Sequence, residues 1–220
     1  YVFSNKTIRG NFVLTSGLLD ANEFMSGSAT ADTVTDTTQM TLFEVPKNID
    51  FTLNSGLKKV LYDKLEISDL KGLIELKNGV AKLTNLSMNL LQGSMQMNGE
   101  YNTSDLTKPS IDFNLKINEI DIPSSFDAFT MVARFAPIAK SAKGKVSAGI
   151  SLQSLLDQHM NPVLPSVSGS GTLSSRSVEI GNSKIFEKLA DALKNEKLRQ
   201  IAVKDLNISF EIKDGRVYVK

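Results

Sequence analysis

The sequence predicts a mainly β protein, a β-rich α+β fold centred on one large, curved and mostly antiparallel sheet built from hairpins. Three observations predict this class: several segments alternate apolar and polar residues, two dipeptides typical of tight turns separate such segments, and only two long stretches have helical periodicity. Alternation gives each strand one apolar and one polar face, which is typical of antiparallel sheets with one solvated side.

Composition narrows the class of protein. Of the 220 residues, 41% are hydrophobic and 22% are charged, which is ordinary for a globular chain. All-β folds of this length are often single units, so we interpret residues 1–220 as one domain. The 25 basic and 24 acidic residues nearly balance, for a net charge of +1, and this balance argues against nucleic acid as a partner. The chain has no cysteine, which excludes disulfides and thiolate metal sites.

The first third of the chain begins with "IRGNFVL" (8–14), where a glycine comes just ahead of a short strand. Residues 26–41 are small, polar and acidic, which predicts a flexible loop. Residues 49–53 alternate as a strand, and "IELKNGVAKL" (74–83) has Asn78-Gly79 between two strands. That dipeptide suits a type I′ turn, which needs positive φ at both central residues.

The middle of the chain has three alternating segments, at 86–90, at "SMQMNGEY" (94–101) and at 111–117. Asn98-Gly99 lies inside the second alternation, so we interpret it as part of a strand that can carry a bulge. After residue 117 the alternation slips by one residue near Asn118–Glu119, which predicts a β-bulge or the end of the strand.

Helical periodicity marks two long segments. "SSFDAFTMVARFAPIAK" (124–140) begins with a capping serine, and Pro137 should end or kink it. "NSKIFEKLADALKNEKL" (182–198) has the clearest apolar stripe, and residues 154–160 predict one short helical turn. The chain then returns to strands, with Asp214-Gly215 predicting a second tight hairpin.

No sequence motif predicts catalysis. The chain has one histidine, His159, in a polar stretch without a nucleophile motif nearby, which favours a surface loop. Acid pairs such as Glu119 with Asp121 are typical of solvated strand ends. We therefore expect no enzyme, with no catalytic, cofactor-binding or metal-binding residues and no cofactor.

The expected sheet is wider than two helices can cover. Roughly nine to eleven strands at ~4.8 Å spacing span ~45 Å, whereas one helix is ~10 Å across. Two main helices packing on or capping the apolar face then shield less than half of it. The remainder folds onto itself, pairs with further sequence or faces an apolar ligand, and the sequence leaves these alternatives open.

Methionines and aromatic residues on the alternating faces are the remaining functional candidates. Methionine is soft and adaptable, which suits a surface for varied acyl chains and equally suits an irregular core. The candidate residues for a lipid groove are Met88, Leu90, Met95, Met97, Phe113 and Leu115. Their alternative role is ordinary core packing.

Once the strands are placed, the chain resembles the C-terminal region of AsmA-like proteins, particularly the forms of Bacteroidetes-type bacteria. The segments that carry the resemblance are "VPKNID" (45–50), Gly72 before a strand, the Asn78-Gly79 hairpin, Gly93-Ser94 and the alternating strand 95–101. "GNFVLTSGLLDANEFM" (10–25) and the strand, helix, strand and hairpin of 171–219 are also similar to the family. The resemblance covers nearly the whole chain and includes no catalytic motif.

The resemblance implies a bacterial envelope protein with a periplasmic β-rich body and an inner-membrane helix at its N-terminus. It therefore implies that this chain is a fragment of a longer protein, anchored to the inner membrane in full length. It also implies a role in outer-membrane biogenesis, with an apolar sheet face that guides phospholipid acyl chains. Our hypothesis is a non-enzymatic module that lines or caps a hydrophobic groove for phospholipid transfer. The alternative is a structural or docking module with a closed core that binds envelope proteins.

Overall fold

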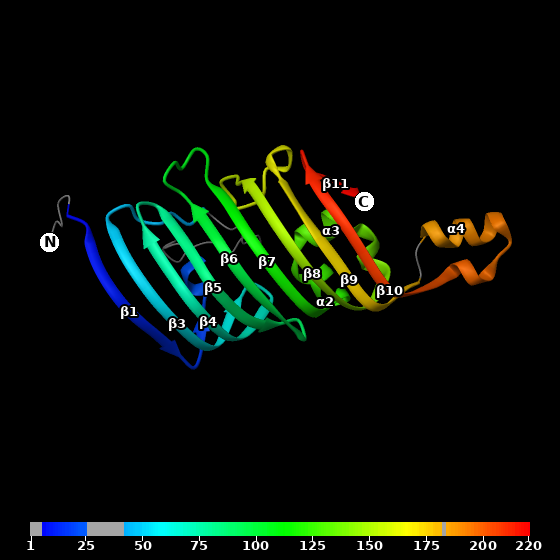
Figure 1. Cartoon of the computed structure of the whole chain (residues 1–220), viewed down its shortest axis with the longest axis horizontal. Helices are drawn as coiled ribbons and strands as arrows, with labels where there is room; N and C mark the ends of the chain where they lie inside the picture. The colour runs from blue at the N-terminus through cyan, green and yellow to red at the C-terminus, as the bar shows by residue number, and fades with distance from the viewer. Residues whose placement is uncertain (1–5, 26–41, 182–183) are drawn as a thin grey trace, which may run out of the picture.

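A computed structural model describes residues 6–25, 42–181 and 184–220, and it confirms a mainly β protein. The described strands form one eleven-stranded open sheet in the order β1-β3-β4-β5-β6-β7-β8-β9-β10-β11, with β2 also beside β3 (Figure 1). The strands are β1 (Ile8–Ser16), β2 (Leu19–Asp20), β3 (Ile49–Tyr62), β4 (Leu65–Lys77), β5 (Val80–Leu90), β6 (Gly93–Asn102), β7 (Ser110–Asp121), β8 (Ala142–Leu155), β9 (Ser168–Gly181), β10 (Gln200–Lys213) and β11 (Arg216–Val219). The loop predicted at 26–41 lies outside the described residues.

The sheet is antiparallel from β3 to β11, whereas β1 and β2 pair with β3 in parallel. Both predicted hairpin turns are confirmed. Asn78 and Gly79 have φ of 52° and 83°, and Asp214 and Gly215 have φ of 50° and 70°. Two successive positive φ angles are the condition for a type I′ turn, which asparagine, aspartate and glycine meet at low cost.

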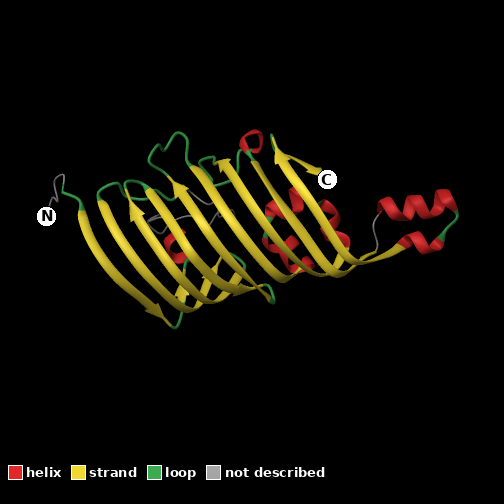
Figure 2. Cartoon of the chain, in the orientation of Figure 1, coloured by secondary structure: helices red, strands yellow, loops and turns green. Residues whose placement is uncertain are grey.

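Irregular positions bend the strands. The predicted slip near Glu119 is confirmed as a bulge, because Glu119 has φ of 51° and the register to β8 shifts between Ile117 and Ile120. Strand β6 runs through Asn98-Gly99, and the irregularity lies on the neighbouring strand at Asn85, whose amide donates to Asn98 Oδ1 at 2.7 Å. Bulges increase local twist, which fits the curved strands in Figure 2.

The first predicted helix is divided into three pieces, α2 (Ile122–Ala128), α3 (Thr130–Phe135) and the 3₁₀ turn η1 (Pro137–Ser141). Asp121 caps α2 by accepting a hydrogen bond from the Ser124 amide at 3.0 Å. The backbone is extended at Phe129, between α2 and α3. Phe126 and Phe129 would share a face in a continuous helix, and the interruption lets them pack against different core clusters.

The second predicted helix is α4 (Lys184–Leu193), followed by the 3₁₀ turn η3 (Glu196–Arg199). The expectation that this helix packs on or caps the apolar face is wrong, because α4 lies beyond the end of the sheet and its main contacts are with η3 (Figure 1). Leu193 is accordingly 62% exposed. An amphipathic sequence predicts that a helix has an apolar side but does not specify what covers that side.

The remaining short elements are the helix α1 (Asn22–Met25) and the 3₁₀ turn η2 (Leu164–Ser166). The helical turn predicted at 154–160 is wrong. Strand β8 continues to Leu155, and the Asp157 carboxylate then accepts hydrogen bonds from the backbone amides of His159 and Asn161, both at 2.8 Å. These bonds stabilise a tight loop instead of a helix.

Two apolar clusters hold the sheet together. The first consists of buried residues of β3, β4 and β5 with Ile120, namely Leu57, Val60, Leu65, Ile67, Leu86, Met88 and Leu90. The second joins Ile122, Ala139, Ala142 and Val178 beneath α2 and η1. The sheet stays open and does not close onto itself as a sandwich. Part of its apolar face therefore lies outside both clusters.

Candidate functional site

The candidate site is the stretch of apolar sheet face between the two core clusters. Strand pairing aligns apolar residues of β6 to β10 into rows that run across the strands. The central row contains Met97, Leu115, Ile150, Gly171 and Phe210. The flanking rows contain Gly99, Phe113, Leu152, Gly169 and Ile212 on one side, and Met95, Ile117, Ala148, Leu173 and Ile208 on the other.

We define the open patch as the half-buried members of these rows that are larger than alanine and belong to neither cluster. They are Phe113, Leu115, Ile150, Leu152, Leu173, Ile208 and Phe210. The patch reaches across four strands, β7 to β10, or three spacings of ~4.8 Å, and is therefore ~14 Å long. None of its members is charged. A contiguous apolar surface of this kind commonly marks a binding surface.

Two phenylalanine rings lie over glycines within these rows. A Cβ atom at Gly171 would lie 2.7 Å from Cζ of Phe210, and a Cβ atom at Gly99 would lie 2.5 Å from Cδ1 of Phe113. Each ring therefore occupies the space of a missing side chain on the neighbouring strand. The rings cover the glycine backbone and keep the patch smooth.

The structure separates the six candidate residues into three groups. Met88 and Leu90, 7% and 5% exposed, belong to the first cluster and do not line the open patch. Met95 and Met97 are partly buried and pack against the edge of that cluster. Phe113 and Leu115 lie in the open patch.

Five members of the open patch did not emerge as candidates from the sequence: Ile150, Leu152, Leu173, Ile208 and Phe210. Ile208 and Phe210 belong to a clear alternating segment, but the sequence does not indicate which strands lie beside it. In β8 and β9 the apolar positions include Ala148, Gly169 and Gly171, which weakens the alternation. Only the strand register brings these five residues next to Phe113 and Leu115.

Residues 42–48 form a strap along one side of the open patch. The Leu42 amide donates to the Gln158 carbonyl at 3.0 Å, and the Tyr101 hydroxyl donates to the Phe43 carbonyl at 2.6 Å. The Val45 amide donates to Thr103 Oγ1 at 2.9 Å, and Val45 is buried. Helix α2 and the second cluster border the opposite side, so the patch lies between the strap and α2 on the apolar face of the sheet.

The open patch is suited to apolar contact, and its described residues carry no constellation for acid–base or metal chemistry. Burial raises the pKa of Tyr101 above its ordinary value, so its phenol stays protonated and donates to the strap. His159 is exposed in the loop after β8. In the described part of the chain, no three histidine, cysteine or acidic residues are placed to hold a metal ion.

Within the described residues, no helix is both long enough and apolar enough to cross a membrane. The chain matches no protein-family model, no curated protein sequence and no solved structure.

Proposed function

We propose that this chain is a non-enzymatic module that holds phospholipid acyl chains against the open patch during lipid transfer in the cell envelope. The observation that carries the proposal is the open patch itself, a set of uncharged apolar side chains between the strap and α2. The resemblance to AsmA-like proteins supports the envelope role. On that resemblance alone, we extend the proposal to the periplasm, with anchoring to the inner membrane in a longer protein.

The dimensions of the open patch suit an acyl chain. The hydrocarbon core of a bilayer is ~30 Å thick, so the acyl chains of one leaflet reach ~15 Å. The patch is ~14 Å long, as derived from the strand spacing. Each methylene moved from water onto an apolar surface contributes ~0.8 kcal/mol, so even partial burial of one chain stabilises a complex.

The proposal is tested by incubating the purified chain with vesicles of phosphatidylethanolamine and phosphatidylglycerol, then measuring retained lipid by native mass spectrometry. Leu115→Asp introduces a carboxylate into the middle of the patch. Asn114→Asp introduces the same group one residue away, on the opposite face of the same strand. We expect the wild type and Asn114→Asp to retain phospholipid, and Leu115→Asp to retain about tenfold less.

Circular dichroism of both variants provides the control for folding. If a folded Leu115→Asp variant retains as much phospholipid as Asn114→Asp, the open patch is not the acyl-binding surface. If the wild type retains no phospholipid, the proposed function itself is wrong.

One observation favours a second candidate function, docking of an envelope protein by strand addition. Among the described residues, β1 pairs with β3 along one edge, and no described strand pairs with its other edge. Three apolar side chains of β1 are exposed: Phe12 by 47%, Val13 by 78% and Leu14 by 37%. A long apolar edge is a template for another strand. Under this alternative, Val13→Lys should abolish co-purification of a partner, whereas Leu115→Asp should not affect it.

A further inference from the structure

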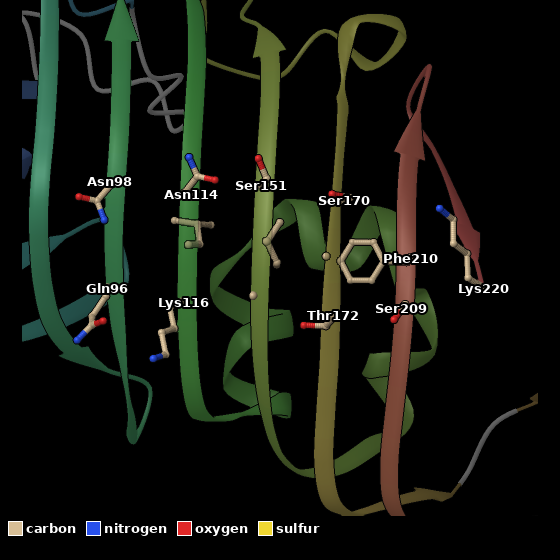
Figure 3. Close-up of a pocket in the computed structure, with 14 residues that line it drawn as sticks. Gln96, Asn98, Asn114, Lys116, Ser151, Ser170, Thr172, Ser209, Phe210 and Lys220 are labelled. Carbon is tan, nitrogen blue, oxygen red and sulfur yellow. The ribbon is translucent and has the colours of Figure 1, made fainter.

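The polar face of the sheet, opposite the open patch, is hollowed over β6 to β10 (Figure 3). Two open hollows, of about 630 and 750 Å³, adjoin there. They share Gln96, Lys116, Gly149 and Thr172, so together they form one shallow polar trough.

Side-chain size explains the hollow. On this face the neighbouring strands β8 and β9 carry Gly149, Ser151, Ser170 and Thr172, which are all small. The flanking strands β6 and β7 carry Gln96, Asn98, Asn114 and Lys116, which are longer. Two strands at ~4.8 Å spacing give the polar trough a floor ~10 Å wide, with a wall of amides along one side.

The lining of the polar trough is nearly neutral. Its charged residues are Lys116 and Lys220, and Lys220 is paired with Glu211 at 3.0 Å. The same face of β1, β3 and β4 instead carries ion pairs between Arg9 and Asp50, Lys77 and Asp50, and Lys59 and Glu66. The lining of the hollows itself consists mainly of hydroxyl and amide groups on this face.

These polar groups have unused hydrogen-bonding capacity. Gln96, Asn114, Ser151, Ser170 and Thr172 make no side-chain hydrogen bond to another residue in the described parts of the chain. An amide offers two donors and an acceptor, and a hydroxyl both donates and accepts. The ligand chemistry that matches such a surface is uncharged and rich in hydroxyl groups.

Other classes of ligand fit the polar trough less well. A nucleic acid needs several cations to neutralise its phosphates, and Lys116 is the one lining cation without a described ionic partner. A protein interface usually centres on buried aromatic or arginine anchors. The lining includes no arginine, and its one aromatic residue, Phe210, belongs to the apolar row of the opposite face.

We propose that the polar trough binds a neutral oligosaccharide chain lying along β8 and β9. Gly149 and the serines allow a sugar ring to come close to the strand backbone, while Gln96 and Asn114 hydrogen-bond its hydroxyl groups. Tyr218 lies two strands beyond Ser170 in the same cross-strand row and is 50% exposed, so it offers an aromatic surface at the rim. The proposal concerns the opposite face from the lipid site and does not depend on it.

The test is a titration of the ¹⁵N-labelled chain with chitohexaose and with maltohexaose, without vesicles, followed by NMR. We expect saturable shifts of the amides on the floor of the polar trough with at least one of the two oligosaccharides. Gly149→Val should weaken that binding about fivefold or more by filling the floor. A Cβ at Gly149 meets only Thr172 Oγ1 at 3.6 Å, an ordinary contact, so we expect the variant to fold.

Two further variants make the result specific. Asn114→Leu removes an amide from the wall without adding bulk, and it should also weaken binding. Thr84→Val lies on the same face outside both hollows and should leave binding unchanged. The absence of saturable shifts with both oligosaccharides, shifts confined to the open patch, or equal affinity of the wild type and both trough variants would overturn the proposal.

Discussion

Because the first cluster is packed and the patch is open, the same substitution should lower the free energy of unfolding by different amounts in the two places. Leu90→Ala and Leu115→Ala remove identical atoms, from a residue that is 5% exposed in the first cluster and from a half-buried residue of the patch. In a packed core, the lost transfer free energy and the cavity together cost about 2 to 5 kcal/mol. At Leu115, three carbons at ~0.8 kcal/mol each are mostly buried, and water rather than a cavity replaces them, so the cost is about 1.5 to 2 kcal/mol.

The assay is urea denaturation of lipid-free protein, followed by circular dichroism. With a slope of about 2 to 3 kcal/mol/M, Leu90→Ala should lower the midpoint by about 1 to 2 M, and Leu115→Ala by about half as much. The slope should stay unchanged in both variants. Equal losses of free energy of unfolding would refute the reasoning, because they would mean that Leu115 is as tightly packed as Leu90.

Three further predictions concern residues that shape the sheet: Gly171, Tyr101 and Asn78. Gly171→Ala should lower the free energy of unfolding by roughly 1–3 kcal/mol, because the new Cβ would lie 2.7 Å from the Phe210 ring and 2.6 Å from a backbone oxygen. Unchanged stability in thermal unfolding would contradict the packing of the Phe210 ring over Gly171. Tyr101→Phe should cost about 1 kcal/mol at pH 7 by removing the bond to Phe43. Because burial raises the pKa of Tyr101, this bond should stabilise the fold below pH ~10 and be lost as pH rises through the raised value, so the wild type and variant should converge in urea unfolding at high pH. Asn78→Ala should cost about 1 kcal/mol in the same assay, since Asn78 has φ of 52°, whereas Asn78→Gly should be nearly neutral.

The strands and turns were predictable because their signals are local. Alternation over a few residues and the Asn78-Gly79 and Asp214-Gly215 dipeptides depend on backbone geometry within one hairpin. The bulge at Glu119 was visible for the same reason, since one extra residue reverses the alternation that follows. The parallel pairing of β1 with β3 had no such local signal.

The position of α4 and the limits of the candidate site depend on tertiary packing. Met88 and Met95 have the same alternating pattern and are paired across β5 and β6, yet only Met88 is fully buried within the first cluster. The difference follows from which residues pack above each strand, including Ile120 beyond the bulge. The sequence predicts an apolar face, whereas the fold decides which part of that face is covered.

The central claim, that the open patch contacts acyl chains, is tested most directly by photo-crosslinking. The purified chain would be incubated with vesicles containing a phosphatidylethanolamine that carries a diazirine in its acyl chain, illuminated, and analysed by peptide mass spectrometry. We predict labels on the apolar positions of β7 to β10, including Leu115, Ile150 and Phe210, and their loss in Leu115→Asp but not in Asn114→Asp. Labels restricted to other surfaces, or equal labelling of both variants, would contradict the claim.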